Sequence, residues 1–390
     1  MTSIYSSDDP TQLYVNAFRD LYYNGVEVGP RGKLTKELRP AVFEFTNPLQ
    51  RVTFARGRVI NPFFQLAESL WILAGGADVA HLVDYNKRMS DFSDDGVYFN
   101  APYGERLRAW GKNSMRALYY GTVDQLVDVC RKLQNDHATR QAVALIYNPL
   151  YDNADVNTKD RPCNIALTFK IRDNKLDLVV FNRSNDLHWG VFGANLVQFS
   201  TIQEAVATWL GAGVGTYYQI TDSLHIYMED YGAKENDKLL AHYENLTHLD
   251  ILGVKGFYFN EPHMSADMKS FHSIMNNYYE LVDPHVSSDT LYENTKDFRD
   301  VVEGVIGKCP DDYLRLTFHM MVAYQAHKRG KVEMMLQALD EIPLCSWKIS
   351  GLRLLYSKYK DVSEFKDQYY YVANEIVSYI EREDVDNGGN

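Results

Sequence analysis

Two short runs of β-branched and aromatic residues, separated by three turn-forming residues, place the strongest constraint on the fold. Residues 165–172 (IALTFKIR) and 176–181 (LDLVVF) have the composition of strands, and residues 173–175 (DNK) suit a tight turn. The segment therefore predicts an antiparallel hairpin. Such a hairpin brings the residues before its first strand close to those after its second strand.

Cys163 stands at the entry of this hairpin and Arg183 at its exit, so thiol and guanidinium are expected to be neighbours. A guanidinium stabilises a thiolate, so we expect the pKa of Cys163 to lie below its reference of about 8.5 and the sulfur to be a nucleophile. A buried structural cysteine is the alternative. We expect that role for Cys130, Cys309 and Cys345, which have no Cys or His at metal-ligand spacing, and we predict no metal site.

A series of short motifs resembles the thymidylate synthase superfamily, which includes the synthases and the phage-type deoxynucleotide hydroxymethylases. The motifs are PCN at 162–164, RSND at 183–186, an asparagine at 195 and LHIY at 224–227, and the similarity extends over roughly residues 25–231. The resemblance implies an α+β fold, a mixed or antiparallel sheet covered by helices. It also implies a homodimer.

The resemblance implies catalytic roles for Cys163, Arg183, Glu68, Tyr103 and Asp186. Glu68 lies in residues 64–75 (FQLAESLWILAG) and Tyr103 in residues 100–110 (NAPYGERLRAW), whereas Asp186 would orient the base and an ordered water. A lone acid in an apolar helix is costly unless it is paired or functional, and an exposed helical glutamate is the alternative. In the functional interpretation Glu68 organises water and protons during base activation.

A substrate phosphate is expected to lie among Arg183, Arg31 and Arg140, because guanidinium groups donate paired hydrogen bonds to oxyanions. The resemblance implies that Arg31 lies in a phosphate-binding loop and that Arg140 reaches the phosphate site of a dimer partner, although Gln141 replaces the family's second arginine. Ser184 would add a hydroxyl donor. Surface ion pairs are the alternative for Arg31, and a solvated turn residue is the alternative for Ser184.

Asn195 is the candidate for reading the base, because an amide offers both a donor and an acceptor to the O4/N3–H edge of uracil. This favours dUMP over dCMP, for which an aspartate would suit better. His225 and Tyr227 are two residues apart, so on a strand they face the same side, and the resemblance implies that they bind the deoxyribose 3′-hydroxyl. The stretch from Asp186 to Asn195 is one residue longer than in typical synthases.

The implied reaction begins with addition of Cys163 to C6 of the pyrimidine, after which C5 takes the one-carbon unit of 5,10-methylenetetrahydrofolate. An exocyclic methylene results. Hydride then gives dTMP, and water gives 5-hydroxymethyl-dUMP. Ser90 and Ser93 stand where synthases usually have shielding indoles, and the acidic tail 381–390 (EREDVDNGGN) replaces an apolar closing tail. Both departures favour water.

We therefore predict a deoxyuridylate hydroxymethylase, with thymidylate synthase as the alternative. Trp189 and the divergent C-terminal region are candidates for substitute shielding. His188 is a candidate for activating water, with a structural or solvent-facing role as its alternative. A hypothesis of another class is an inactive nucleotide-binding regulatory protein on the same scaffold.

After the matched motifs, the chain is expected to form a separate helical region. Residues 1–264 are predicted to form the catalytic domain and residues 265–390 a helical C-terminal extension with a flexible acidic tail. The helix candidates there are residues 312–330, 331–342, 345–360 and 365–383.

Composition and charge limit the other classes of function. A net charge of −12 disfavours extended contact with nucleic acid, although a mononucleotide needs only a local basic pocket. We find no apolar run of membrane-spanning length and no secretory signal in the sequence. Four cysteines in this length predict reduced thiols and a cytoplasmic location, which for a phage-encoded protein is the host cytoplasm.

Overall fold

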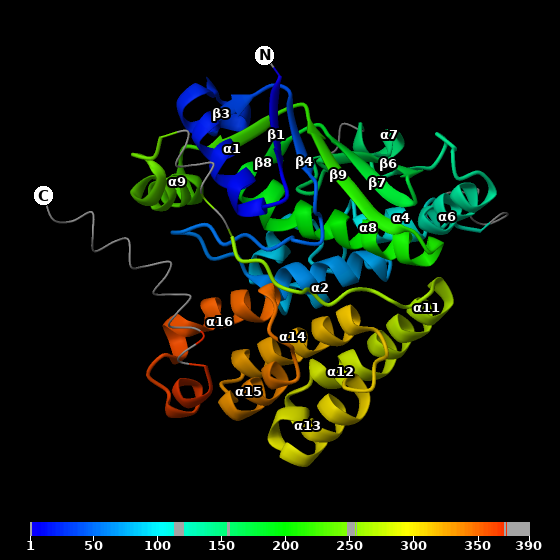
Figure 1. Cartoon of the computed structure of the whole chain (residues 1–390), viewed down its shortest axis with the longest axis vertical. Helices are drawn as coiled ribbons and strands as arrows, with labels where there is room; N and C mark the ends of the chain where they lie inside the picture. The colour runs from blue at the N-terminus through cyan, green and yellow to red at the C-terminus, as the bar shows by residue number, and fades with distance from the viewer. Residues whose placement is uncertain are drawn as a thin grey trace, which may run out of the picture. The chain divides into compact units, whose positions relative to one another are not determined.

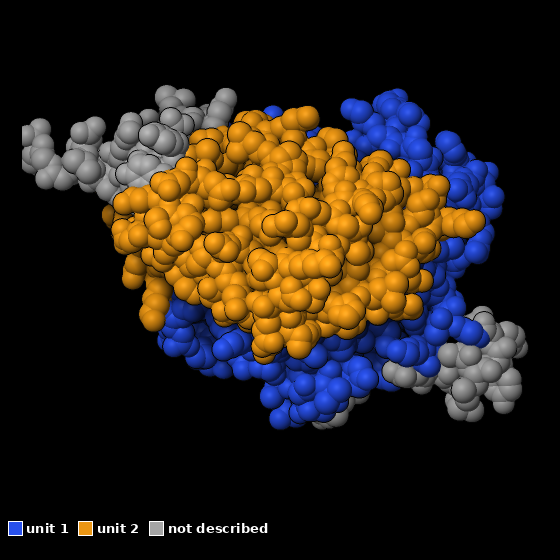
Figure 2. All heavy atoms as spheres, turned by 90° about the horizontal axis from the view of Figure 1, so that it is seen from below, with its two compact units in different colours: residues 1–51, 67–232 blue, residues 52–66, 233–390 orange. Residues whose placement is uncertain are grey.

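The computed structural model describes residues 2–112, 121–153, 157–247, 254, 256–369 and 372. It divides the chain into two compact units, coloured in Figure 2. Unit 1 comprises Met1–Arg51 and Ala67–Gly232, and unit 2 comprises Val52–Leu66 and Ala233–Asn390.

Unit 1 is built on a mixed six-stranded sheet, seen in Figure 1. Its strands, in spatial order, are β1 (Ser3–Ser7), β4 (Ala41–Phe45), β9 (Gly213–Thr221), β7 (Lys175–Asn182), β6 (Asn164–Arg172) and β5 (Val143–Leu145). The pairs β1/β4 and β7/β9 are parallel, and the other neighbours are antiparallel. The α+β fold with a mixed sheet is thus confirmed.

The predicted hairpin is formed by β6 and β7, with a turn one residue shorter than expected. Lys175 pairs with Arg172, which leaves Asp173 and Asn174 as the turn. Their φ angles of 48° and 57° lie in the left-handed region that two-residue hairpin turns require. Asp and Asn tolerate this region better than most residues, so the local sequence is sufficient to set the register.

A second, four-stranded sheet in unit 1 lies beside the chemistry-bearing motifs. Its order is β2 (Val26–Val28), β3 (Thr35–Leu38), β10 (Leu224–Tyr227) and β8 (Asn185–Asp186). The parallel pairing of β8 with β10 sets Asp186 opposite His225. Residues far apart in the sequence thereby meet at one sheet.

Helices cover one face of the six-stranded sheet. The helical segments that begin in unit 1 or cross into it are α1 (Pro10–Asn24), η1 (Pro30–Gly32), α2 (Pro62–Leu73), α3 (Ala80–Val83), η2 (Lys87–Phe92), α4 (Tyr103–Arg108), α6 (Gln125–Asn135), α7 (Pro149–Asp152), η3 (Leu187–Asn195), α8 (Leu196–Leu210) and α9 (Asp230–Tyr243). Helix α8 packs against β7 and β9 and is almost entirely buried. Within it, Glu204 forms a buried ion pair with Arg51 (2.6 Å). A buried carboxylate needs such a partner.

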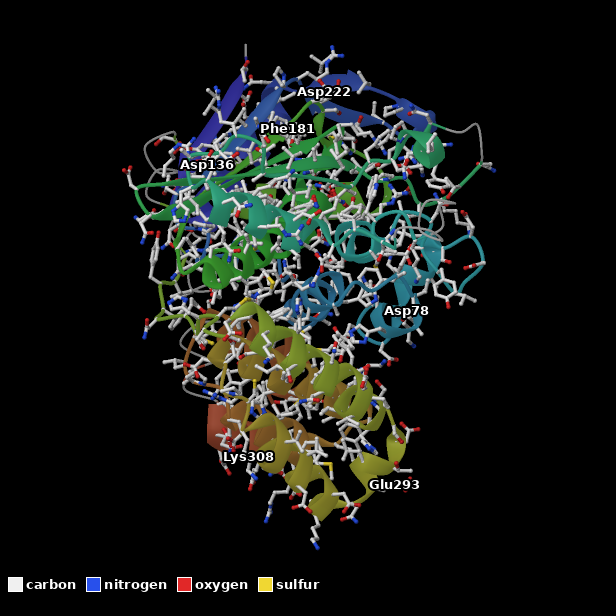
Figure 3. All side chains as sticks on the ribbon, turned by 90° about the vertical axis from the view of Figure 1, so that its right-hand side faces the viewer. Asp78, Asp136, Phe181, Asp222, Glu293 and Lys308 are labelled. Carbon is white, nitrogen blue, oxygen red and sulfur yellow. The ribbon has the colours of Figure 1, made fainter. Side chains whose placement is uncertain are left out.

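The opposite sheet face carries partly exposed apolar side chains. Val143 and Leu145 of β5 are 39% and 43% exposed, and Phe181 of β7, labelled in Figure 3, is 37% exposed. Leu145 and Phe181 both pair with Ala166 of β6, so they share a face. This face has the apolar character of an interaction surface.

The segment η3 between β8 and α8 is a nine-residue π-helix. Asp186 caps its N-terminus by accepting hydrogen bonds from the backbone N–H groups of His188 and Trp189 (2.6 and 2.9 Å). A π-helical turn holds one more residue than an α-helical turn. A π-helical segment therefore has room for the additional residue expected between Asp186 and Asn195.

Unit 2 is helical in its described part. Its helices beyond α9 are α11 (Met268–Asn277), η4 (Tyr278–Val282), α12 (Asp283–Val286), η5 (Asp289–Glu293), α13 (Thr295–Val301), η6 (Val302–Ile306), α14 (Asp312–Lys328), α15 (Val332–Asp340) and α16 (Ser346–Tyr359). Figure 3 labels Glu293 and Lys308 in this unit. The predicted helices at 312–330, 331–342 and 345–360 are confirmed by α14, α15 and α16, whereas most of 370–390, the acidic tail included, lies outside the described residues.

The two units differ from the expected division at residues 264 and 265. The change of unit falls after Gly232, and residues 52–66 belong to the helical unit. The reason is local packing: Phe63 stacks on Tyr324 with ring centroids 5.1 Å apart, and Arg353 donates a hydrogen bond to the carbonyl of Ala55 (2.9 Å). The two partners in each contact are about 260 to 300 residues apart in the sequence. Periodicity within a short stretch of sequence therefore cannot predict these contacts.

Candidate active site

A cavity of about 1340 Å³ in unit 1 brings the predicted site residues together. Its lining includes the following predicted residues: Arg31, Glu68, Tyr103, Cys163, Arg183, Ser184, Asp186, Asn195, His225 and Tyr227. Arg140 is exposed on the loop before β5 and does not line the cavity among the described residues.

Cys163 and Arg183 are neighbours, as the hairpin predicts. The backbone N–H of Arg183 donates to the carbonyl of Cys163 (3.0 Å), and one guanidinium nitrogen lies 4.0 Å from the Sγ atom. The guanidinium is held in place because its Nε donates to the carbonyl of Pro162 (2.9 Å). On the other side, the N–H of Cys163 donates to the hydroxyl of Tyr103 (3.3 Å).

The expected direction of the Cys163 pKa shift is wrong. Burial raises the pKa of the Cys163 thiol, and the charges of Arg183 and Arg31 lower it only in part. Desolvation disfavours the charged thiolate more than the two guanidinium groups favour it. The resting form is therefore the thiol, and the arginines favour the thiolate once it forms.

The other three cysteines are buried and have no disulfide partner. Burial raises the pKa of Cys130 and of Cys345 to about 12, and it also raises the pKa of Cys309. The prediction that these thiols are structural agrees with this burial.

A chain of three asparagines presents Asn195 to the cavity. The amide of Asn164 donates to Oδ1 of Asn195 (3.2 Å) and also to the side-chain oxygen of Asn182. Asn182 in turn donates to the carbonyl of Ile220 (3.3 Å). These contacts fix the orientation of the Asn195 amide. Sequence reasoning quoted Asn164 within the PCN motif but gave it no role, although its adjacency to Cys163 was a usable signal.

Glu68 is buried in α2 and lines the cavity. Burial raises the pKa of its carboxyl group to about 7, and a hydrogen bond with Gln198 opposes this rise. The alternative of an exposed helical glutamate is excluded by the 7% exposure of the side chain. A carboxyl group with a pKa near neutrality can both give and take a proton at physiological pH.

Glu68→Gln is expected to raise stability while lowering turnover. The carboxyl pKa is higher in the folded state (about 7) than the ordinary glutamate value of 4.5, so its contribution to stability is full below 4.5 and is lost as pH rises through 7. At pH 8 the neutral amide should therefore raise the free energy of unfolding by roughly 2–3 kcal/mol, with little change at pH 4.5.

Denaturant titrations at the two pH values, together with steady-state turnover, check this prediction. Loss of proton transfer should lower turnover by roughly 100-fold. The exposed Glu27 provides the control, because Glu27→Gln should change neither quantity. Equal stability of wild type and Glu68→Gln at both pH values would contradict the assigned burial effect.

Asp186 is held by a residue that the sequence motifs did not reveal. Its second oxygen accepts a hydrogen bond from the hydroxyl of Tyr231 (2.7 Å). Tyr231 reaches this position because the chain bends tightly on both sides of it. Asp230 has a φ of 53°. Gly232 packs closely on the preceding strand, since a Cβ at position 232 would lie 2.4 Å from the carbonyl oxygen of Tyr227. The only sequence signal was a tyrosine shortly after the LHIY strand.

His188 does not face the cavity, so its candidacy for activating water is wrong. Its ring is fully buried, and Nδ1 lies 2.7 Å from the hydroxyl of Tyr14. It also packs on Phe18, with ring centroids 5.9 Å apart. The structural alternative is thus the one observed. The adjacent Trp189 does line the cavity.

The sugar and phosphate candidates all line the cavity except Arg140. His225 and Tyr227 are half-buried on one face of this strand, with ring centroids 5.4 Å apart. Arg31 lies in the exposed turn η1 with a φ of 55°, and its charge acts on Cys163. With Arg183, it makes this end of the cavity cationic, as an anionic phosphate requires.

Ser90 and Ser93 turn away from the cavity into their own loop. The hydroxyl of Ser90 donates to the carbonyl of Lys87 (2.9 Å), and that of Ser93 donates to the carbonyl of Tyr98 (2.7 Å). Neither serine lines the cavity. Its apolar wall consists of Trp71, Ile72, Leu82, Met89, Phe92, Phe99 and Trp189.

The described part of the chain also bears on metal binding and on membrane insertion. No group of His, Cys, Asp and Glu residues there has the arrangement of a metal site. Among the same residues, no helix combines the length and the apolar character that spanning a bilayer demands.

Comparison with known proteins adds independent findings. A family model described as thymidylate synthase matches residues 12–265. The chain is 50% identical over 384 residues to a deoxyuridylate hydroxymethyltransferase of Bacillus phage SP01. The aligned residues make up 97% of this chain and 99% of the relative. It is 30% identical to a deoxyuridylate hydroxymethyltransferase of Pseudomonas phage M6, over 87% of this chain and 90% of the relative. A putative thymidylate synthase of Methanosarcina barkeri is 37% identical over 35% of this chain and 58% of the relative.

Proposed function

This chain belongs to the thymidylate synthase family, and we propose that it is a deoxyuridylate hydroxymethyltransferase that converts dUMP into 5-hydroxymethyl-dUMP. The observation that carries the proposal is the single cavity that holds the Cys163 sulfur, the Arg183 guanidinium and the Asn195 amide together. Similarity over nearly the whole length to a phage deoxyuridylate hydroxymethyltransferase supports the product.

Nucleotide binding uses the polar part of the cavity. Arg31, Arg183 and Ser184 would bind the phosphate, and His225 with Tyr227 would bind the deoxyribose hydroxyl. The Asn195 amide would pair with the uracil edge, because Asn164 already holds its orientation. A nucleotide bound in this way would have C6 of its ring within reach of the Cys163 sulfur, which adds to it and makes C5 nucleophilic.

The cavity has room for a one-carbon donor beside the nucleotide. Sites for single drug-sized ligands have volumes of roughly 300–1,000 Å³, and this cavity, at about 1340 Å³, is larger. The apolar wall that includes Trp71 and Trp189 fits a flat heteroaromatic ring. The family implies a folate-type donor, and we propose 5,10-methylenetetrahydrofolate, which supplies the one-carbon unit.

A homodimer and a location in the host cytoplasm complete the proposal. The partly exposed apolar face of the six-stranded sheet supports a two-fold interface between copies of the chain. In such a dimer Arg140 would reach the partner's phosphate site, which agrees with its exposure outside its own cavity. The location rests on the phage origin of the relatives.

Product analysis tests the proposed reaction. Incubation with dUMP and 5,10-methylenetetrahydrofolate is expected to give 5-hydroxymethyl-dUMP by mass spectrometry, with no dihydrofolate formed. Formation of dTMP with stoichiometric dihydrofolate would instead establish a thymidylate synthase. An inactive nucleotide-binding protein would release no tritium from dUMP labelled at C5.

A further inference from the structure

Asp160 is a carboxylate of the same cavity to which neither the motifs nor the comparisons assign a role. It lies three residues before Cys163 and lines the cavity. Its Oδ2 atom accepts a hydrogen bond from the backbone N–H of Ala101 (2.7 Å), and its carbonyl accepts one from the amide of Asn100 (3.2 Å). Asp160 thereby joins the loop before Cys163 to the loop that leads into Tyr103.

The charge of Asp160 acts on the reacting centre. It contributes to the raised pKa of Cys163 and of Tyr103, and the hydrogen bond from Ala101 holds the carboxylate beside the loop that leads into Tyr103. Burial raises the pKa of Asp160 itself, as expected for an acid partly removed from water. Its second oxygen, Oδ1, accepts no hydrogen bond from the residues that the structure describes. That oxygen is available to a water molecule in the cavity.

Asp186 is the other carboxylate whose charge acts on Cys163, and both of its oxygens already accept hydrogen bonds. Asp186 uses Oδ1 to accept the N–H groups of His188 and Trp189 and uses Oδ2 to accept the Tyr231 hydroxyl. A carboxylate that caps a helical segment and accepts a phenol donor is held as a positioning group. Asp160 has the free oxygen that a proton acceptor needs.

We propose, on the basis of the proposed function, that Asp160 is the general base that activates the water attacking the exocyclic methylene. This carbon is bonded to C5, next to the C6 atom that carries the Cys163 sulfur, so the attacking water must lie close to that sulfur. Asp160 shares the cavity with Cys163, three residues away in the chain, and its Oδ1 accepts no hydrogen bond from the described residues, so it can take a proton from such a water.

Asp160 takes a proton from water while the water oxygen forms a bond to the exocyclic methylene carbon. The π electrons of the exocyclic double bond move onto the ring as an enolate at C4. The enolate then collapses, restores the C5–C6 double bond and expels the Cys163 thiolate, which receives the proton. The step consumes one water and involves no oxidation or reduction.

Asp160→Asn separates this step from those before it. Loss of the C5 proton precedes water attack, so a single turnover with excess enzyme and 5-tritiated dUMP should release tritium within about twofold of wild type, whereas hydroxymethyl product should form roughly 100-fold more slowly. Added 2-mercaptoethanol, which attacks as a thiolate, should capture the methylene as a thioether in this variant. Asp160→Glu, which keeps the carboxylate, should restore part of the hydroxymethyl product.

The matched control is Asp94→Asn in the neighbouring loop. Asp94 accepts hydrogen bonds from the hydroxyl of Thr158 (2.6 Å) and the N–H of Lys159 (3.0 Å), but it does not line the cavity. This control should keep wild-type product formation. The proposal is overturned if folded Asp160→Asn forms hydroxymethyl product at the wild-type rate, or if tritium release and product fall together. Formation of dTMP by the wild type would refute the proposed function instead.

Discussion

Cys163→Ser is expected to abolish turnover and tritium release from 5-tritiated dUMP while leaving nucleotide binding largely intact. A serine hydroxyl has nearly the shape of the thiol but is a far weaker nucleophile at neutral pH, so the loss should be on the order of 10⁴-fold or more. Binding should survive because Arg183, Asn195 and Tyr227, the proposed nucleotide ligands in the cavity, are unchanged in this variant. Tritium release and equilibrium dialysis with dUMP check the two halves of this prediction.

The control is Cys130→Ser in α6, a buried thiol outside the cavity, which should keep the chemistry at a cost in stability. Undiminished tritium release from Cys163→Ser would disprove the nucleophile.

The same variant also tests the proposed site shared between subunits. Mixing it with inactive Arg140→Ala should restore about one quarter of wild-type activity, because half of the dimers are mixed and each has one complete site. No recovery would count against arginines shared between subunits.

Asn195→Asp is expected to move the preference from dUMP towards dCMP. The Asn195 amide offers a donor and an acceptor to uracil, whereas a carboxylate only accepts and so meets O4 of uracil with like charge. The efficiency kcat/KM for dUMP should fall by roughly 100-fold, the cost of an unmatched buried polar group, while that for dCMP should rise. Asn164 still donates to a carboxylate at this position, so the local fold should persist.

Kinetics with both nucleotides measure the change in preference. Asn195→Ala is the matched variant, because it removes the amide without adding a carboxylate and should lower dUMP efficiency with no gain for dCMP. If Asn195→Asp keeps the wild-type ratio between the two nucleotides, position 195 does not read the base.

Cavity residues outside the quoted motifs emerged only from the folded chain. Asp160 accepts a hydrogen bond from Ala101, two residues before Tyr103, and Tyr231 donates one to Asp186. The spacing of Asp160 from Cys163 was visible in the sequence, but no pattern distinguishes a cavity carboxylate from a solvated loop residue. Likewise, His188 could be excluded only once its contact with Tyr14, 174 residues away, was known.

Features with a local physical cause could be predicted from the amino-acid sequence. Alternating β-branched residues around Asp173 and Asn174 specified the hairpin, and the hairpin made Cys163 and Arg183 neighbours. The two-residue spacing of His225 and Tyr227 put both on one face of a strand. Strand pairing and side-chain alternation depend on neighbours in the chain, so they can be read without the fold.

Tertiary structure alone decided the electrostatics and the boundaries. The pKa of Cys163 rises although Arg183 is beside it, because burial outweighs the charges of Arg183 and Arg31. Residues 52–66 belong to the helical unit because Phe63 packs on Tyr324. The desolvation and the packing of a side chain depend on atoms from the whole fold, so a short stretch of sequence does not determine them.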